Sequence, residues 1–224
     1  IHRYGGGEHY ARALIPLLLK ECSGTGMNQA YIAMVSTTTF EAQLKLIETS
    51  FYGDLKPFSD WLVVPLVAAL SDDFDRSSDA MAARQYLADM GIDYDERPTD
   101  EKKGYTNSIT IDLTGSLDAD TLRRASVRGT VAEGNLMISR INDFDKLYFE
   151  PRGATVFFMY KDRPGVLGQI GAALAAAGVN IDDVRNPHDS KGVLSLAIMK
   201  VSQPVPADVV RQIAHAIAVR RQSP

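Results

Sequence analysis

The segment Tyr160–Leu167, YKDRPGVL, marks a change from strand to helix in the last third of the chain. The apolar run at 155–160 predicts a strand, and Pro164 suits the first turn of a helix that continues to 177. Gly178 predicts the end of that helix, since glycine is favoured just past a helix C-terminus. The sequence therefore predicts a strand, a turn with free backbone N–H groups, and a helix.

The remaining elements of this region complete a small domain, which we place at 153–224. Two further strands are predicted at 179–184 and 194–201, and a second helix at 206–218. The short tail that follows is the candidate for a last strand. The predicted order is βαββα with a possible final β, which is the ferredoxin-like arrangement.

The residues before this domain predict an α/β domain with helices packed on a mixed sheet, so the fold class of the whole chain is α+β. Glycines 5–7 predict a linker, and we assign 1–26 to this linker and an N-terminal helix at 8–21, and 27–152 to the α/β domain. No element is predicted for 22–43. The predicted strands are 44–55, 92–97, 108–113, 127–131, 136–141 and 147–150, and the predicted helices are 57–70, which Pro65 should kink or divide, and 77–90.

Two polar residues of the last domain suggest a site for a small zwitterion. We expect Asp162, where the first strand ends, to lie near Asn180, where the second strand opens. The helix N-terminus favours a carboxylate, and the side chains of Asp162 and Asn180 suit an ammonium and a hydroxyl group. The plain alternative is that Asp162 caps the helix and Asn180 closes a turn.

The YKDRPGVL segment, with Asn180 opening the next strand, resembles the signature of ACT domains. In the ACT domains of D-3-phosphoglycerate dehydrogenases, L-serine binds as a feedback inhibitor at the interface between two ACT domains. The resemblance implies that Tyr160 and Asp162 orient the effector, that Asn180 hydrogen-bonds it, and that Gly165 and Val166 present backbone N–H groups. The effector-binding residues that it implies are Tyr160, Asp162, Arg163, Pro164, Gly165, Val166, Leu167, Asn180 and Ile181.

The resemblance extends upstream, where 128–131 is similar to a strand of the intervening, allosteric substrate-binding domain of the longer phosphoglycerate dehydrogenases. It implies a possible anion site, with solvated surface charge as the alternative for each basic residue. The candidates are Arg128, Arg140, Lys146 and Arg152. It also implies a regulatory chain without catalytic residues, whose copies associate through both domains. NAD would be bound by a catalytic domain elsewhere in the parent chain.

Two other interpretations remain open. The first is an ACT-type sensor for another amino acid, in another enzyme such as L-serine dehydratase, or a free-standing small-molecule-binding protein. The second is an enzyme with a site at 93–105, where acids and tyrosines cluster.

Composition excludes several other classes. The net charge of -4 and the dispersed Lys and Arg residues argue against nucleic acid as a partner. No uninterrupted apolar run is long enough for a membrane span. The single cysteine, Cys22, predicts no internal disulfide and no metal site, and favours the cytoplasm. The four histidines lie far apart in the sequence, so we interpret each as a surface residue.

Overall fold

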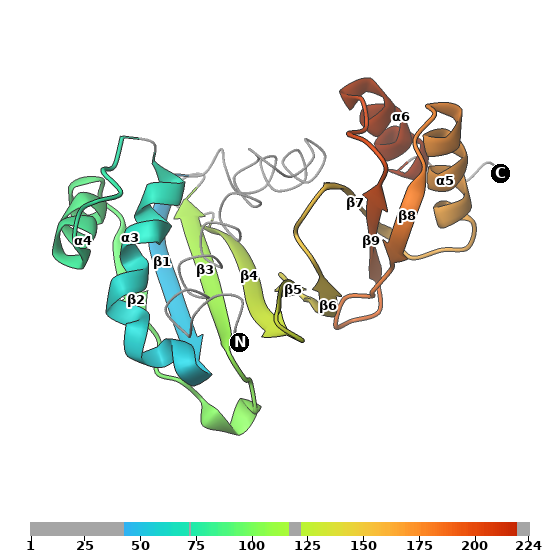
Figure 1. Cartoon of the computed structure of the whole chain (residues 1–224). Coiled ribbons are helices and arrows are strands. Elements are labelled where there is room, and N and C mark those ends of the chain that lie inside the picture. Colours follow the sequence, from blue (N-terminus) through green and yellow to red (C-terminus); the bar gives the residue numbers. More distant parts are fainter. Residues whose placement is uncertain (1–42, 72, 117–121, 219–224) are drawn as a thin grey trace.

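The chain forms two β-sheets, each with helices on one face (Figure 1). A computed structural model describes residues 43–71, 73–116 and 122–218. The first sheet has six strands in the order β2-β1-β3-β4-β5-β6, and the second has three in the order β7-β9-β8. This confirms the α+β fold class. The predicted linker, N-terminal helix and final strand lie outside the described residues.

The first sheet contains one parallel pair of strands, β1 and β2, and its other pairs are antiparallel. Helices α3 and α4 connect β1 to β2 and cover one face of the sheet, as a parallel connection requires (Figure 1). The elements are β1 (Gln43–Tyr52), η2 (Gly53–Phe58), α3 (Ser59–Leu70), α4 (Ala80–Asp89), β2 (Asp93–Glu96), η3 (Glu101–Lys103), β3 (Ser108–Ser116), β4 (Leu122–Ala132), β5 (Asn135–Ile141) and β6 (Phe144–Phe149).

The predicted elements of this domain all exist, but several begin or end elsewhere. The first strand stops at Tyr52, because Gly53 turns the chain with φ +64° into the 3-10 segment that contains Pro57. Helix α3 continues through Pro65 as one element, so this proline does not divide it, and the alternative that Pro65 kinks the helix stays a prediction. A proline removes only one N–H donor, and the packed helix tolerates that loss.

The second sheet and its two helices follow the predicted order βαββα. Its elements are β7 (Ala154–Lys161), α5 (Val166–Ala176), β8 (Ile181–Arg185), β9 (Leu194–Val201) and α6 (Ala207–Ala218). Both helices cover the same face (Figure 1). Side chains of that face, such as Val156, Phe158 and Met199, form a core with Ile170 and Leu174 of α5.

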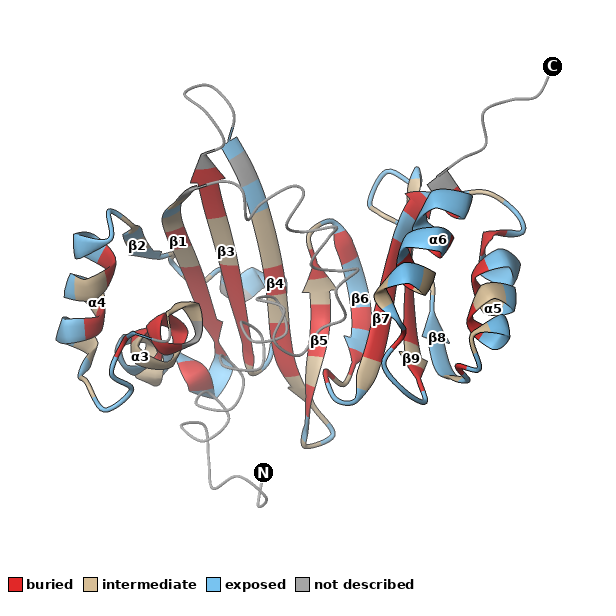
Figure 2. Ribbon diagram, turned by 90° about the horizontal axis from the view of Figure 1, so that it is seen from above, coloured by how far each residue is buried: buried red, intermediate tan, exposed pale blue. Residues whose placement is uncertain are grey.

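The other face of the second sheet packs against the first domain. Phe157, Leu196 and Ile198 belong to the same buried cluster as Leu147 and Phe149 of β6. The rings of Phe149 and Phe157 meet edge to face, with centroids 5.7 Å apart. Figure 2 shows the buried strands of both sheets meeting at β6 and β7. The core of the first domain therefore extends onto the helix-free face of the second sheet, while the helix-covered face has a core of its own.

Candidate functional site

The residues at the end of β7 form the centre of the candidate site. The Asp162 backbone N–H donates to the Val193 carbonyl at 3.0 Å, and Asp162 Oδ1 accepts a hydrogen bond from Ser195 Oγ at 2.8 Å. Helix α5 begins at Val166, with Gly165 at its N-cap in a left-handed conformation (φ +87°) and no side-chain cap. The alternative that Asp162 caps this helix is therefore wrong, and its carboxylate binds Ser195 instead.

Tyr160 lies two residues before Asp162 on the same face of the sheet. Its side chain is 5% exposed, and its hydroxyl donates a hydrogen bond to Asn186 Oδ1 at 2.7 Å. Burial raises the pKa of the Tyr160 phenol, and the bond to Asn186 only partly offsets this. Tyr160 therefore stays neutral at physiological pH.

The loop between β8 and β9 brings His188 to the same place, which the sequence analysis missed. His188 Nδ1 lies 3.0 Å from Ser195 Oγ and 3.9 Å from Asp162 Oδ2. Asp189 holds this loop, because its Oδ1 accepts the backbone N–H groups of Val193 at 2.7 Å and Leu194 at 3.0 Å. One signal was present in the sequence. Ser195 is a polar residue in an otherwise apolar part of β9.

Asp162, Ser195 and His188 are not arranged as a nucleophilic triad. In such a triad the histidine lies between the serine and the acid, so that it can accept the serine proton. Here the serine lies in the middle, and its side chain is 0% exposed. The arrangement can fix a carboxylate in place, but it does not present a nucleophile.

Asn180 lies at the opposite end of the sheet from Asp162, so the expectation that the two lie together in one chain was wrong. Strands β7 and β8 both run antiparallel to β9. Lys161 pairs with Leu194 at the start of β9, whereas Ile181 pairs with Val201 at its end. The length of β9 separates these ends by about 24 Å, at roughly 3.4 Å per residue.

The physical reason is that α5 carries the chain back along the sheet. Strand β8 therefore starts at the end where β7 starts. Asn180 makes local contacts there, with its Nδ2 donating to Asp182 Oδ1 at 3.0 Å and its backbone N–H to Ser202 Oγ at 3.1 Å.

The other residues implied for effector binding differ in their exposure. Arg163 donates a hydrogen bond to the Ile217 carbonyl in the last turn of α6, where a cation is favourable. Val166 is 1% exposed and belongs to the core, while Leu167 is 37% exposed. Pro164 and Gly165 are exposed, and Ile181 is half-buried.

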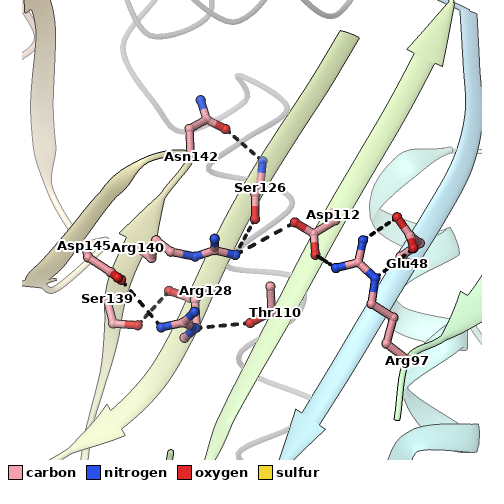
Figure 3. A network of polar contacts seen from close by, with 10 residues as sticks. All are labelled: Glu48, Arg97, Thr110, Asp112, Ser126, Arg128, Ser139, Arg140, Asn142 and Asp145. Atoms are coloured by element: carbon pink, nitrogen blue, oxygen red, sulfur yellow. Dashed lines mark hydrogen bonds and ion pairs between the residues drawn. The ribbon is translucent and has the colours of Figure 1, made fainter. Parts of the chain in front are cut away.

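A network of charged and polar side chains crosses the first sheet (Figure 3). Arg97, which follows β2, forms ion pairs with Glu48 and, at 2.9 Å, with Asp112. The hydrogen bond from Arg97 is the main reason that the pKa of Glu48 is lowered. Glu48 lies between Ile47 and Thr49, both buried, so the network occupies the face away from the helices.

The network brings together two of the four candidates for an anion site. Arg128 Nη1 lies 3.5 Å from Asp145 Oδ1, and Arg140 Nη2 lies 3.8 Å from Asp112 Oδ1 and also contacts Ser126. Each arginine thus already faces a carboxylate, with which an anion would compete.

Lys146 and Arg152 are exposed, the first within β6 and the second in the turn that follows. An anion site at these four residues stays a prediction.

The segment 93–105 is engaged in structural contacts. The Tyr94 hydroxyl lies 3.1 Å from the Thr49 hydroxyl, and burial raises the pKa of the Tyr94 phenol. Tyr105 stacks edge to face on Tyr52 at 5.1 Å, and the Arg128 guanidinium lies 4.0 Å from the centre of its ring. These contacts stabilise the fold and do not support an enzyme site here.

Two absences apply to the described part of the chain. Within 43–71, 73–116 and 122–218 there is no group of three or more His, Cys, Asp or Glu side chains that could hold a metal ion. None of the helices described there is long and apolar enough to cross a membrane.

Comparison with known proteins gives the same assignment for the second domain. Residues 154–214 match the family model of the ACT domain. The chain is 32% identical over 98 residues to D-3-phosphoglycerate dehydrogenase of Mycobacterium leprae, covering 43% of this chain and 18% of that protein.

Longer matches are less identical. The D-3-phosphoglycerate dehydrogenase of Bacillus subtilis is 22% identical over 176 residues, covering 79% of this chain and 31% of that protein. The enzyme of Synechocystis is 23% identical over 206 residues, covering 91% and 35%. The chain thus spans a fifth to a third of the length of these relatives. It contains an ACT domain, and it is similar to part of the D-3-phosphoglycerate dehydrogenases.

Proposed function

We propose that this chain is the regulatory, non-catalytic part of a D-3-phosphoglycerate dehydrogenase, and that it binds L-serine between the ACT domains of two copies. The ACT match and the named relatives support the first half of this proposal. The NAD-dependent chemistry would take place in another part of the parent chain.

The observation that carries the second half is the separation of Asp162 from Asn180. Asp162 and Asn180, the two residues that the resemblance implies, lie at opposite ends of the second sheet, so neither end of one copy holds both of them. Strands β7 and β8 are the two edges of this sheet, and four of the five residues of β8 are exposed, whereas most of β7 is buried. An exposed edge of unpaired N–H and C=O groups favours pairing with another strand.

Pairing of β8 with β8 of a second copy brings the two ends together. A twofold axis makes the two strands antiparallel, so the start of one lies beside the end of the other. Asn180 of the partner subunit then lies at the end that holds Tyr160 and Asp162, near the N-terminus of α5. Two equivalent sites result, each built from both copies.

In each site the chemistry of the residues matches a serine zwitterion. Asp162 would bind the ammonium group, the free N–H groups at the start of α5 would bind the carboxylate, and Asn180 of the partner subunit would bind the hydroxyl group. Buried Tyr160 keeps a neutral phenol at the base of the site.

Calorimetric titration of L-serine into the chain tests the ligand. We expect heat with serine, and loss of that heat in Asp162→Ala and in Asn180→Ala. Asp143→Ala and Asn135→Ala serve as matched controls, because both residues are exposed in the first domain. A preference for valine, isoleucine or phenylalanine over serine would contradict the serine assignment and favour another amino-acid sensor.

Mixing the two variants tests the shared site. After subunit exchange, a heterodimer of Asp162→Ala with Asn180→Ala carries one intact site and one site that lacks both residues. Random mixing therefore restores about a quarter of the serine sites if each dimer has two sites. A site built within one chain gives no restoration.

A further inference from the structure

We propose that Ser195 and His188 are positioning residues for Asp162, and that protonation of His188 weakens effector binding as the pH falls. This inference rests on the proposed function, since it concerns how the same carboxylate is held. It assigns a role to two residues that lie outside the resemblance.

The hydrogen bonds set the direction of each proton. Ser195 has one hydroxyl hydrogen, which it donates to Asp162 Oδ1 at 2.8 Å. Its oxygen must then accept from His188 Nδ1, 3.0 Å away, so that nitrogen carries a hydrogen. The chain of donors therefore runs from His188 through Ser195 to the Asp162 carboxylate.

Ser195 holds the carboxylate directly from β9, and His188 in the β8–β9 loop acts through Ser195. Ser195 is fully buried and pairs directly with Tyr160 across β7 and β9. His188 pairs with Ser195 in an isolated bridge next to these strands. Buried Ser195 fixes the rotamer of Asp162, while the half-exposed imidazole of His188 can exchange a proton with solvent.

The arginines of the neighbouring elements have other partners. Arg163, before α5, is turned to the Ile217 carbonyl. Arg185, at the end of β8, contacts the Leu147 carbonyl at 3.1 Å and Asp183 at 3.4 Å.

In the loop itself, Asp189 binds backbone amides and Lys191 is exposed. Asp162, at the end of β7, is thus the carboxylate within 4 Å of the imidazole, with Oδ2 at 3.9 Å from Nδ1.

The sign of the pH effect follows from this geometry. A protonated His188 places a positive charge beside Asp162, where the ammonium group of the effector would also bind. The two cations compete for one carboxylate, so the affinity falls when His188 becomes charged. Both side chains are about half exposed, and solvent limits the effect to about 1.5- to 5-fold.

The test is calorimetric titration of L-serine at about pH 8 and about pH 6, which bracket the range in which histidine usually titrates. We expect the wild-type chain to bind more weakly at the lower pH and His188→Gln to lose this difference. His215→Gln is the matched control, because His215 is exposed on α6 and should leave the pH profile unchanged. Ser195→Ala should weaken binding about three- to tenfold at both pH values, since Asp162 loses its donor.

The outcomes separate the two proposals. No heat with the wild-type chain at either pH would overturn the serine-binding function itself. Serine binding whose pH dependence is the same in His188→Gln as in the wild type would overturn the role of His188 alone. Unchanged affinity in Ser195→Ala would overturn the role of Ser195.

Discussion

Replacement of Phe157 by alanine tests whether the core of the first domain extends onto the second sheet. Phe157 is 1% exposed on the helix-free face of β7 and packs edge to face on Phe149 of β6. A buried Phe→Ala change usually costs about 3 to 5 kcal/mol of folding free energy. The ring contact between Phe157 and Phe149 should contribute about 0.5 to 1.5 kcal/mol of this cost. A double-mutant cycle of the two residues measures that contribution as their coupling energy.

The assay uses the only tryptophan of the chain. Trp61 lies in α3 of the first domain, so its fluorescence reports that domain, while far-UV circular dichroism reports both. In urea, Phe157→Ala should shift both signals to lower concentration together. Met159→Ala, a 41% exposed position two residues along the same strand, should shift neither appreciably. A Trp61 transition that stays at the wild-type urea concentration while the dichroism signal shifts would refute this extension of the first core onto the second sheet.

Three further changes test local features. Arg97→Ala should destabilise the chain by about 1 to 2 kcal/mol, discounted for the 41% exposure of its side chain, because it leaves Glu48 and Asp112 without their partner. The pKa of Glu48 is lower in the folded chain, so its ionised carboxylate stabilises the fold at neutral pH, and this stabilisation is lost as the pH falls through that pKa. The free energy of unfolding should therefore fall less steeply with decreasing pH in Arg97→Ala than in the wild type. Asp79 is the N-cap of α4, and its side chain accepts the Ala82 N–H at 2.8 Å. Asp79→Ala should lower the free energy of unfolding by about 1 kcal/mol, measured by thermal unfolding. No change would show that the cap does not stabilise the fold. Lys146→Gly should raise stability by up to about 1 kcal/mol, because Lys146 has φ +59° within β6, and a loss of stability would contradict the idea of strain there.

Much of the second domain could be predicted because its signals are local. Gly178 follows the end of α5 as predicted, whereas Pro164 lies just before the Gly165 N-cap and not in the first turn of the helix. The first domain was harder, since the length of β4 depends on pairing with β3 and β5 rather than on its own polar residues. Pro65 does not divide α3, because tertiary packing outweighs a local helix-breaking preference.

The candidate site could be predicted only in part. The motif predicted Tyr160 and Asp162 as site residues. No local pattern predicted that His188 and Ser195 lie beside them, because the β8–β9 loop and β9 bring these two residues there. The separation of Asp162 from Asn180 is a matter of strand direction. The predicted strand–helix–strand order already implied it, because a crossover helix returns the chain to the end at which the first strand began.

A crystal structure of the chain grown with L-serine would test the central claim most directly. We predict two copies joined through β8, with serine bound between Asp162 of one copy and Asn180 of the partner subunit. Serine bound within a single copy, or copies joined in a way that leaves Asn180 in solvent, would contradict it.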